Sequence, residues 1–167
     1  ACIALDVKPN QVLAHVDSVT FCLSKALSSP IGSILCGSSD FIDNARYIRK
    51  SIGGGMRQSG VIAAAGIISL KHMVKRIKED HNNAQLLASG ISSISSVDID
   101  IAKVKTNIIY FNINHDTISQ SEFVKSIKDK GILFNDYIGK HCRLVLHAGI
   151  TKKDVEKVIL EFNKLLS

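Results

Sequence analysis

Lys25 is the residue whose type and position most directly suggest chemistry. It follows the apolar segment of residues 16–23 and lies beside Ser24 and Ala26. A lysine between apolar strand ends is expected to be partly desolvated, which lowers the pKa of its amine and makes the neutral form available. A neutral primary amine can form a Schiff base with an aldehyde cofactor. On pattern alone, however, an exposed surface lysine is the commoner case.

A run of three glycines, residues 53–55, is preceded by Lys50 and followed closely by Arg57. Consecutive glycines can turn backbone N–H groups toward an anion, and an arginine can bind a phosphate through two parallel hydrogen bonds. The pattern therefore indicates an anion site around Lys50 and Arg57. The alternative is a loop that only ends a helix and turns the chain, which glycine clusters often do.

Arg143 stands at the start of the apolar segment of residues 143–147. An arginine that enters a buried strand often faces a carboxylate, either of the protein or of a ligand. A salt bridge within the protein is the first expectation, because an unpaired buried charge is costly. His147 and His81 could titrate near neutral pH, but nothing near either of them in the sequence forms a base–nucleophile pair.

The elements that would position Lys25 lie in an apolar first part of the chain that glycine and serine interrupt. Strands rich in β-branched residues are expected at residues 16–23 and 31–36. Helical spacing predicts a helix over residues 41–50, and small and branched side chains predict a fully buried helix over residues 59–70. This arrangement places Lys25 in a loop where one strand ends.

The second part of the chain is more charged and its elements are shorter. We expect helices at residues 71–90, 121–129 and 151–166, and strands at residues 97–104, 107–113, 132–137 and 143–147. Gly90 is the expected C-cap of the first helix, and Ser119 or Ser121 the N-cap of the second. Thr151 and Asp154 form a capping box for the third. These elements predict an α/β lobe with a small antiparallel sheet.

Composition limits the classes of function. The chain has 167 residues, of which 46% are hydrophobic and 22% charged, so it can form one compact domain or two small lobes and is not disordered as a whole. The net charge of +6 suits a small anionic ligand. Nucleic acid is not expected as a partner, because aromatic residues make up only 5% and the basic residues are scattered.

The sequence gives no sign of a membrane partner. No apolar run approaches the roughly 20 residues that a membrane span needs, and no signal peptide is visible. The four cysteines contain no Cys-x-x-Cys pair, so neither a metal site nor a disulfide framework is supported. Reduced thiols suit the cytoplasm or an organellar matrix, and we expect a cytoplasmic location.

Together these segments closely resemble the L-threonine aldolases, which are pyridoxal-phosphate (PLP) enzymes of the aspartate-aminotransferase, or type I, fold. The resemblance covers residues 16–27, 30–33, 49–50, 53–60, 63–66, 80–81 and 142–145. Its most specific part is a Ser-Lys pair at a strand end, followed at this spacing by Gly-Gly-Gly-Met-Arg-Gln. It implies an α/β fold in which residues 1–72 end the large PLP-binding domain and residues 73–167 form the complete small domain.

The resemblance also implies roles for single residues. Lys25 would be the lysine that forms the Schiff base with pyridoxal 5′-phosphate, in place of the surface-lysine alternative. Lys50 and Arg57 would lie near the cofactor phosphate or at the neighbouring subunit's site. Arg143 would bind the substrate's α-carboxylate. The family cleaves the β-hydroxy amino acids L-threonine or L-allo-threonine to glycine and acetaldehyde, usually as a homotetramer, a dimer of dimers with its sites at dimer interfaces.

The chain departs from the family pattern in two ways. Ala26 stands where the family usually has glycine, and Ser28 and Ser29 replace a smaller pair, which adds bulk beside Lys25. Family members also carry a His-x-Asp-Gly-Ala-Arg stretch before the matched part, and its aspartate pairs with the pyridinium nitrogen. The chain is therefore expected to be the C-terminal half of a threonine aldolase and inactive by itself. The alternatives are a related PLP-dependent lyase or transaminase, and an inactive remnant that serves as an assembly or interaction subunit.

Overall fold

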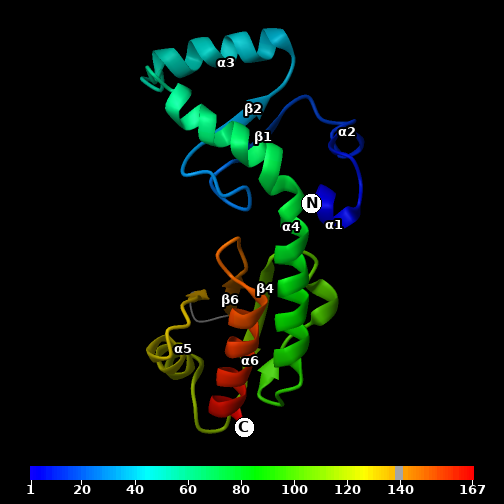
Figure 1. Ribbon diagram of the computed structural model, residues 1–167, viewed down its shortest axis with the longest axis vertical. Coiled ribbons are helices and arrows are strands. Elements are labelled where there is room, and N and C mark those ends of the chain that lie inside the picture. Colours follow the sequence, from blue (N-terminus) through cyan, green and yellow to red (C-terminus); the bar gives the residue numbers. More distant parts are fainter. Residues whose placement is uncertain (138–140) are drawn as a thin grey trace. The chain divides into compact units, whose positions relative to one another are not determined.

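The computed structural model describes residues 1–137 and 141–167, and for residues 135–137 it describes the backbone alone. The elements are α1 (Cys2–Leu5), α2 (Pro9–Val12), β1 (Val19–Cys22), β2 (Ser33–Cys36), α3 (Ser39–Ser51), α4 (Gly60–Ser92), β3 (Val97–Asp98), the 3-10 turn η1 (Ile101–Lys103), β4 (Ile108–Ile113), α5 (Gln120–Asp129), β5 (Asn135–Tyr137), β6 (His141–Val145) and α6 (Lys152–Leu166). They form two compact units, Ala1–Ile77 and Lys78–Ser167, and both contain helices and strands (Figure 1). The assignment of residues 1–72 and 73–167 to a large and a small domain stays a prediction.

In the first unit, two short helices precede a two-stranded antiparallel ribbon. No helix is predicted from the sequence at α1 or α2. Each of them spans only four residues, which is too short to show a helical pattern in the sequence. β1 pairs with β2 in a register that runs from Val19 opposite Cys36 to Cys22 opposite Ser33. Both strands lie inside the predicted segments but are shorter, and most of their side chains are exposed rather than in a sheet interior.

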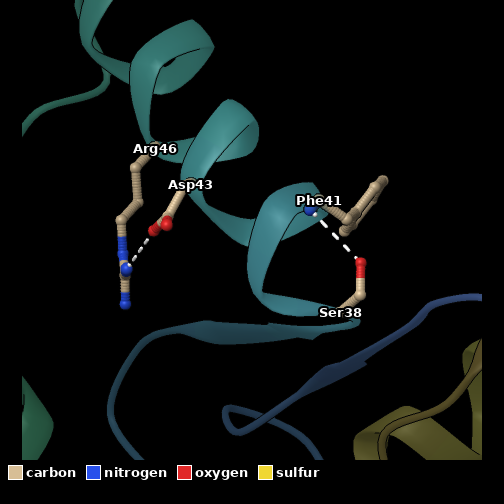
Figure 2. A network of polar contacts seen from close by, with 4 residues as sticks. All are labelled: Ser38, Phe41, Asp43 and Arg46. Atoms are coloured by element: carbon tan, nitrogen blue, oxygen red, sulfur yellow. Dashed lines mark hydrogen bonds and ion pairs between the residues drawn. The ribbon is translucent and has the colours of Figure 1, made fainter.

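The side chain of Ser38 caps the N-terminus of α3. Ser38 Oγ accepts a hydrogen bond from the backbone N–H of Phe41 at 3.3 Å, which satisfies one of the free N–H groups of the first turn (Figure 2). Asp43 and Arg46, one turn apart, form an exposed ion pair at 2.8 Å (Figure 2). The helix was predicted two residues too short at its start and one too short at its end.

One continuous helix, α4, replaces the two helices expected at residues 59–70 and 71–90. Its 33 residues include the boundary between the two units. The predicted C-cap at Gly90 is wrong, because this glycine lies inside the helix. A Cβ at Gly90 would lie 2.3 Å from Cδ1 of Ile159 in α6, so close packing between helices is what requires glycine here.

The predicted full burial of residues 59–70 is also wrong within this chain. Val61 and Ile68 are 80% and 59% exposed, whereas Gly66 and Ser69 are buried. The apolar composition of this segment predicted its helical structure correctly. Composition says nothing of which surface, if any, covers an apolar helix face.

The second unit is built on a four-stranded antiparallel sheet in the order β3-β4-β6-β5. This confirms the predicted antiparallel lobe. In the centre β4 pairs with β6, so that Ile109 lies opposite Leu144 and Tyr110 opposite Arg143. The strand expected at residues 97–104 is reduced to β3, because Asp100 caps the 3-10 turn that follows it.

The core of this unit lies between one face of the sheet and helices α4, α5 and α6 (Figure 1). Along β6 and just beyond it, Cys142, Leu144 and Leu146 are buried, while Arg143 and Val145 alternate with them on the other face. Aromatic rings fill the space between the helices and the sheet, and those of Phe123 and Phe162 meet edge to face with centroids 4.9 Å apart. We call the other face of β4 and β6, which carries Arg143 and Tyr110, the open face.

Capping boxes begin both α5 and α6. The box at Thr151 is as predicted, and at α5 the structure selects Ser119 rather than Ser121 as the N-cap. The Ser119 hydroxyl accepts from the backbone N–H of Glu122 at 3.3 Å, and the Glu122 carboxylate accepts from that of Ser119 at 2.9 Å. Thr151 and Asp154 form the same pair of hydrogen bonds, at 3.3 and 2.8 Å. The hydroxyl and then the backbone N–H of each cap residue lower the pKa of the carboxyl group that accepts from them.

Candidate active site

Lys25 lies in a tight turn directly after β1. The backbone N–H of Ser28 donates to the Lys25 carbonyl at 2.8 Å, and that of Ser29 donates to the Leu23 carbonyl at 3.0 Å. Leu23 and Leu27 are buried on either side of the lysine. The turn is thus held by backbone hydrogen bonds and two leucine anchors, and Lys25 lies between the anchors.

The Lys25 side chain itself is exposed. The partial desolvation expected from the sequence is therefore wrong for this chain, because the apolar neighbours pack away from the amine rather than around it. The loop position after a strand, on which the prediction of a reactive lysine depends, is present. The amine is accessible to a ligand.

Gly66 of α4 packs closely against Leu23, one of the two leucines that anchor this turn. A Cβ at Gly66 would lie 2.9 Å from Cδ1 of Leu23, closer than real Cβ contacts allow. Gly32, with φ of 120°, adopts a conformation that favours glycine, and its carbonyl accepts from the Leu23 N–H at 2.9 Å. The resemblance included the Ala-Ala-Ala-Gly segment, but only the structure shows that Gly66 lets α4 approach the Lys25 turn.

The three glycines of residues 53–55 end α3 and contact its last turn. The N–H groups of Gly53 and Gly54 donate to the carbonyls of Lys50 and Arg49 at 3.2 and 2.8 Å. These two N–H groups therefore cap the helix. The sequence pattern had instead suggested that they turn toward an external anion. A Cβ at Gly55 would lie 3.1 Å from Cδ of Lys50, so the lysine side chain folds over the loop.

Arg57 follows the loop in an exposed turn just before α4. The Lys50 side chain lies against Gly55, which is two residues before Arg57. Lys25 lies in the turn after β1, whereas Lys50 lies in the last turn of α3 and Arg57 precedes α4. The two cations and the amine occupy separate segments of the first unit.

Arg143 lies on the open face of the sheet and is partly buried. It contributes to a cavity of about 490 Å³ between the end of α5 and β6. The lining residues are Val124, Lys128, Leu133, Phe134, Arg143, Val145 and His147. Cationic groups and an apolar floor together suit a ligand that has an anionic end and a small apolar part.

No protein carboxylate is paired with Arg143 among the side chains that the structure describes, which exclude those of residues 135–140. The sequence favoured a salt bridge between Arg143 and a carboxylate of the protein. The described side chains do not provide that carboxylate. A carboxylate is the group that the planar fork of a guanidinium matches best.

The histidines differ in their surroundings. Burial lowers the pKa of His81, which favours its neutral form. His147 lines the Arg143 cavity, and its Nδ1 accepts from the backbone N–H of Gly149 at 3.1 Å. The sequence singled out neither Asn112 nor His141, whose ring hydrogen-bonds to the Asn112 side chain on the open face at 2.7 Å. That contact depends on the register between β4 and β6, for which the sequence carries no local signal.

Comparison with known proteins decides the family. The family model described as beta-eliminating lyase matches residues 1–114, which contain the Lys25 turn, the glycine loop and all of α4. The chain belongs to the beta-eliminating lyase family. The matched segment ends at the last strand before α5, so this family assignment includes three of the four predicted site residues but not Arg143.

A curated relative extends the likeness of this beta-eliminating lyase family member to its whole length. The Arabidopsis thaliana protein named "Probable low-specificity L-threonine aldolase 2" is 40% identical over 166 residues, which are 99% of this chain and 47% of the relative. The chain spans about half the length of the curated threonine aldolases that it matches. The resemblance to the threonine aldolases is confirmed.

Solved structures of other proteins share the fold. A Listeria monocytogenes protein assigned as an L-allo-threonine aldolase has a TM-score of 0.75 at 21% identity and aligns with 98% of this chain and 48% of its own. A PLP-dependent aminotransferase from Streptococcus suis has a TM-score of 0.64 at 16% identity and aligns with 90% of this chain and 42% of its own. The predicted α/β fold of the type I class is confirmed.

Over the described residues, no helix is long and apolar enough to cross a membrane. In the same part of the chain, no three His, Cys, Asp or Glu side chains gather in a way that could hold a metal ion.

Proposed function

We propose that this chain supplies the lysine and the substrate arginine of a PLP-dependent aldolase that cleaves L-threonine or L-allo-threonine to glycine and acetaldehyde. The observation that carries the proposal is Arg143, a partly buried guanidinium in a cavity with no described carboxylate to pair with it. The threonine aldolase names of its relatives, which match 99% of the chain, support the same activity.

The chemistry of the donor set fits PLP. Lys25 offers a primary amine in an accessible, anchored turn, which suits the cofactor's aldehyde. Lys50 and Arg57 offer two exposed cations next to the glycine loop, which suit its phosphate. We infer that Lys25 holds the cofactor and that Lys50 and Arg57 bind its phosphate, in the same or the neighbouring subunit.

In the proposed reaction, PLP supplies an aldehyde and a ring that accepts electrons from the substrate's α-carbon. Arg143 binds the α-carboxylate with two parallel hydrogen bonds. By fixing the carboxylate, Arg143 also sets which bond at the α-carbon is held in the orientation that cleavage needs. Lys25 would hold the cofactor through its primary amine between turnovers.

The assembly and the location are proposals too. We propose a homo-oligomer, a dimer of dimers, in which a neighbouring subunit shares the site. The exposed positions of Lys50 and Arg57 support sharing of this kind, because both side chains are accessible to another subunit. We propose a cytoplasmic location, which the four free cysteines support because reduced thiols persist there.

The test is acetaldehyde release from L-threonine by the full-length protein with added PLP. We expect turnover that disappears in Lys25→Ala. Cofactor binding without acetaldehyde release, but with another reaction of an amino acid, would favour a related lyase or transaminase instead. Absence of cofactor binding would favour an inactive assembly subunit. The matched control is Lys103→Ala, which removes an exposed lysine from the other unit and should leave turnover unchanged.

A further inference from the structure

The cavity that contains Arg143 offers more hydrogen-bond donors than one carboxylate uses. Lys128 and His147 line this cavity of about 490 Å³ together with Arg143, and its other lining residues are apolar. No aspartate or glutamate side chain is among them in the described part of the chain, which excludes the side chains of residues 135–140. One α-carboxylate occupies the guanidinium fork of Arg143. Lys128 and His147 are therefore available to a second group of the same ligand.

Lys128 is fixed at its backbone and open at its side chain. It lies in the last turn of α5, and its carbonyl accepts from the backbone N–H of Gly131 at 2.9 Å. Ile127, the residue before it, is fully buried. The lysine side chain is exposed, and none of the carboxylates that the structure describes pairs with its ammonium group. Lys128 thus brings one positive charge to the cavity from an anchored position.

His147 contributes a donor rather than an acceptor. Its Nδ1 accepts from the backbone N–H of Gly149 at 3.1 Å, so this nitrogen carries no proton. The proton of the neutral ring is therefore on Nε2, where it can be donated. The carbonyl of His147 accepts from the backbone N–H of Ile150 at 2.8 Å, which holds the residue in place beside the cavity.

The size and the charge of the cavity indicate which group the second one is. Its volume lies within the range of about 300–1,000 Å³ that pockets for drug-sized ligands have, so an amino acid as small as L-threonine leaves part of it empty. Arg143 matches the charge of the α-carboxylate, and Lys128 beside a neutral His147 matches one further negative charge. A carboxylate has that charge, whereas a phosphate monoester carries about −1.5 to −2.

We propose that this cavity selects amino acids with a carboxylate on the side chain, which Lys128 and His147 bind while Arg143 binds the α-carboxylate. The inference rests on the proposed function for the role of Arg143, and it extends the substrate class to β-hydroxy-L-aspartate. Cleavage of its bond between the α- and β-carbons gives glycine and glyoxylate. The β-hydroxyl group loses its proton as the β-carbon becomes the aldehyde carbon. The α-carbon, which keeps the electron pair of the broken bond, takes up a proton.

The first experiment measures binding and needs no turnover. L-aspartate and L-asparagine have nearly the same size and differ in the charge of the side chain. By calorimetry on the full-length protein, we expect a dissociation constant about twofold to fivefold lower for L-aspartate, because the charge of Lys128 is exposed. This preference should fade as salt rises from about 0.05 M to about 0.5 M.

Variants of two lysines in α5 assign the preference to a residue. Lys128→Gln should abolish it, and Lys128→Arg, which restores a cation, should recover most of it. The matched control is Lys125→Gln, which removes an exposed lysine of the same helix that does not line the cavity. Equal dissociation constants for the two amino acids in the wild-type protein, a preference that survives Lys128→Gln, or binding of neither amino acid would overturn the inference.

The second experiment compares two substrates in the full-length protein with added PLP. We expect glyoxylate release from β-hydroxy-L-aspartate and acetaldehyde release from L-threonine. Lys128→Gln and His147→Phe should each lower the ratio of the two kcat/KM values, β-hydroxy-L-aspartate over L-threonine, about twofold to fivefold. An unchanged ratio in both variants would show that these residues have a merely structural role, and it would overturn the inference.

Failure of the proposed function would be recognised separately. If the wild-type protein releases no acetaldehyde from L-threonine, the aldolase activity is refuted, and the comparison of L-aspartate with L-asparagine still decides the inference. Acetaldehyde release together with equal binding of these two amino acids would refute the inference alone.

Discussion

Replacement of Arg143 by lysine should separate ligand binding from protein stability. No described carboxylate pairs with Arg143, so the substitution breaks no described ion pair, and the lysine stem can still cover the apolar wall of the cavity. We expect the free energy of unfolding to change by about 0.5 kcal/mol or less. The substrate, in contrast, loses a bidentate contact that a single ammonium group cannot reproduce. We expect kcat/KM to fall at least about tenfold, or about 1.4 kcal/mol of transition-state stabilisation.

Two assays on the same full-length protein measure these effects. Urea denaturation gives the stability difference, and acetaldehyde release from L-threonine gives kcat and KM. Arg46→Lys is the matched control, because the guanidinium of Arg46 is exposed and paired with Asp43 within α3. It should change neither quantity. Unchanged kinetics for Arg143→Lys, together with a stability loss above about 1 kcal/mol, would show that Arg143 is a structural residue and refute the reasoning.

Three further predictions concern packing, pH and the chain by itself. Gly90→Ala should destabilise the protein by about 1–2 kcal/mol in urea denaturation, because the overlap of the new methyl group with Ile159 costs more than the gain in helix propensity. Gly60→Ala is the control and should not destabilise the protein, because a Cβ at Gly60 meets open space. Equal effects of the two substitutions would contradict the packing argument. The lowered pKa of Asp154 means that its ionised form stabilises the native state above the unfolded pKa of about 3.8, so the difference in urea midpoint between the wild-type protein and Asp154→Asn should be full at pH 7 and vanish as the pH falls below that value. A difference that persists at pH 2 would refute this. Residues 1–167 alone should release acetaldehyde at less than a tenth of a typical rate, on the order of 10 per second. The resemblance implies that the aspartate that pairs with the cofactor ring lies outside the matched part, and this chain spans only 47% of its relative. Faster turnover would show the rest of the relative to be dispensable.

Features with local causes could be predicted from the sequence. The capping box of Thr151 and Asp154 depends on residues three positions apart, and α6 begins where this signal predicts. Ser119, one of the two predicted N-cap candidates, begins α5. The loop position of Lys25 follows from the apolar strand before it. The alternation of Cys142 and Leu144 with Arg143 similarly follows from the period of a strand.

Features that depend on distant contacts could not be predicted. Gly90 has the composition signal of a helix end, yet Ile159, far along the chain, packs against it and the helix continues. The exposure of Lys25 depends on which way Leu23 and Leu27 pack, which the local sequence does not determine. The contact between Asn112 and His141 needs the register of two strands that are separated by α5 and β5.

The central claim, that Lys25 is the residue that holds the cofactor, is tested most directly by chemical trapping. The full-length protein is loaded with PLP, reduced with borohydride and digested, and the modified peptide is identified by mass spectrometry. The account predicts a pyridoxyl group on Lys25 and its loss in Lys25→Ala. A pyridoxyl group on a different lysine, or an adduct that persists in Lys25→Ala, would contradict the account.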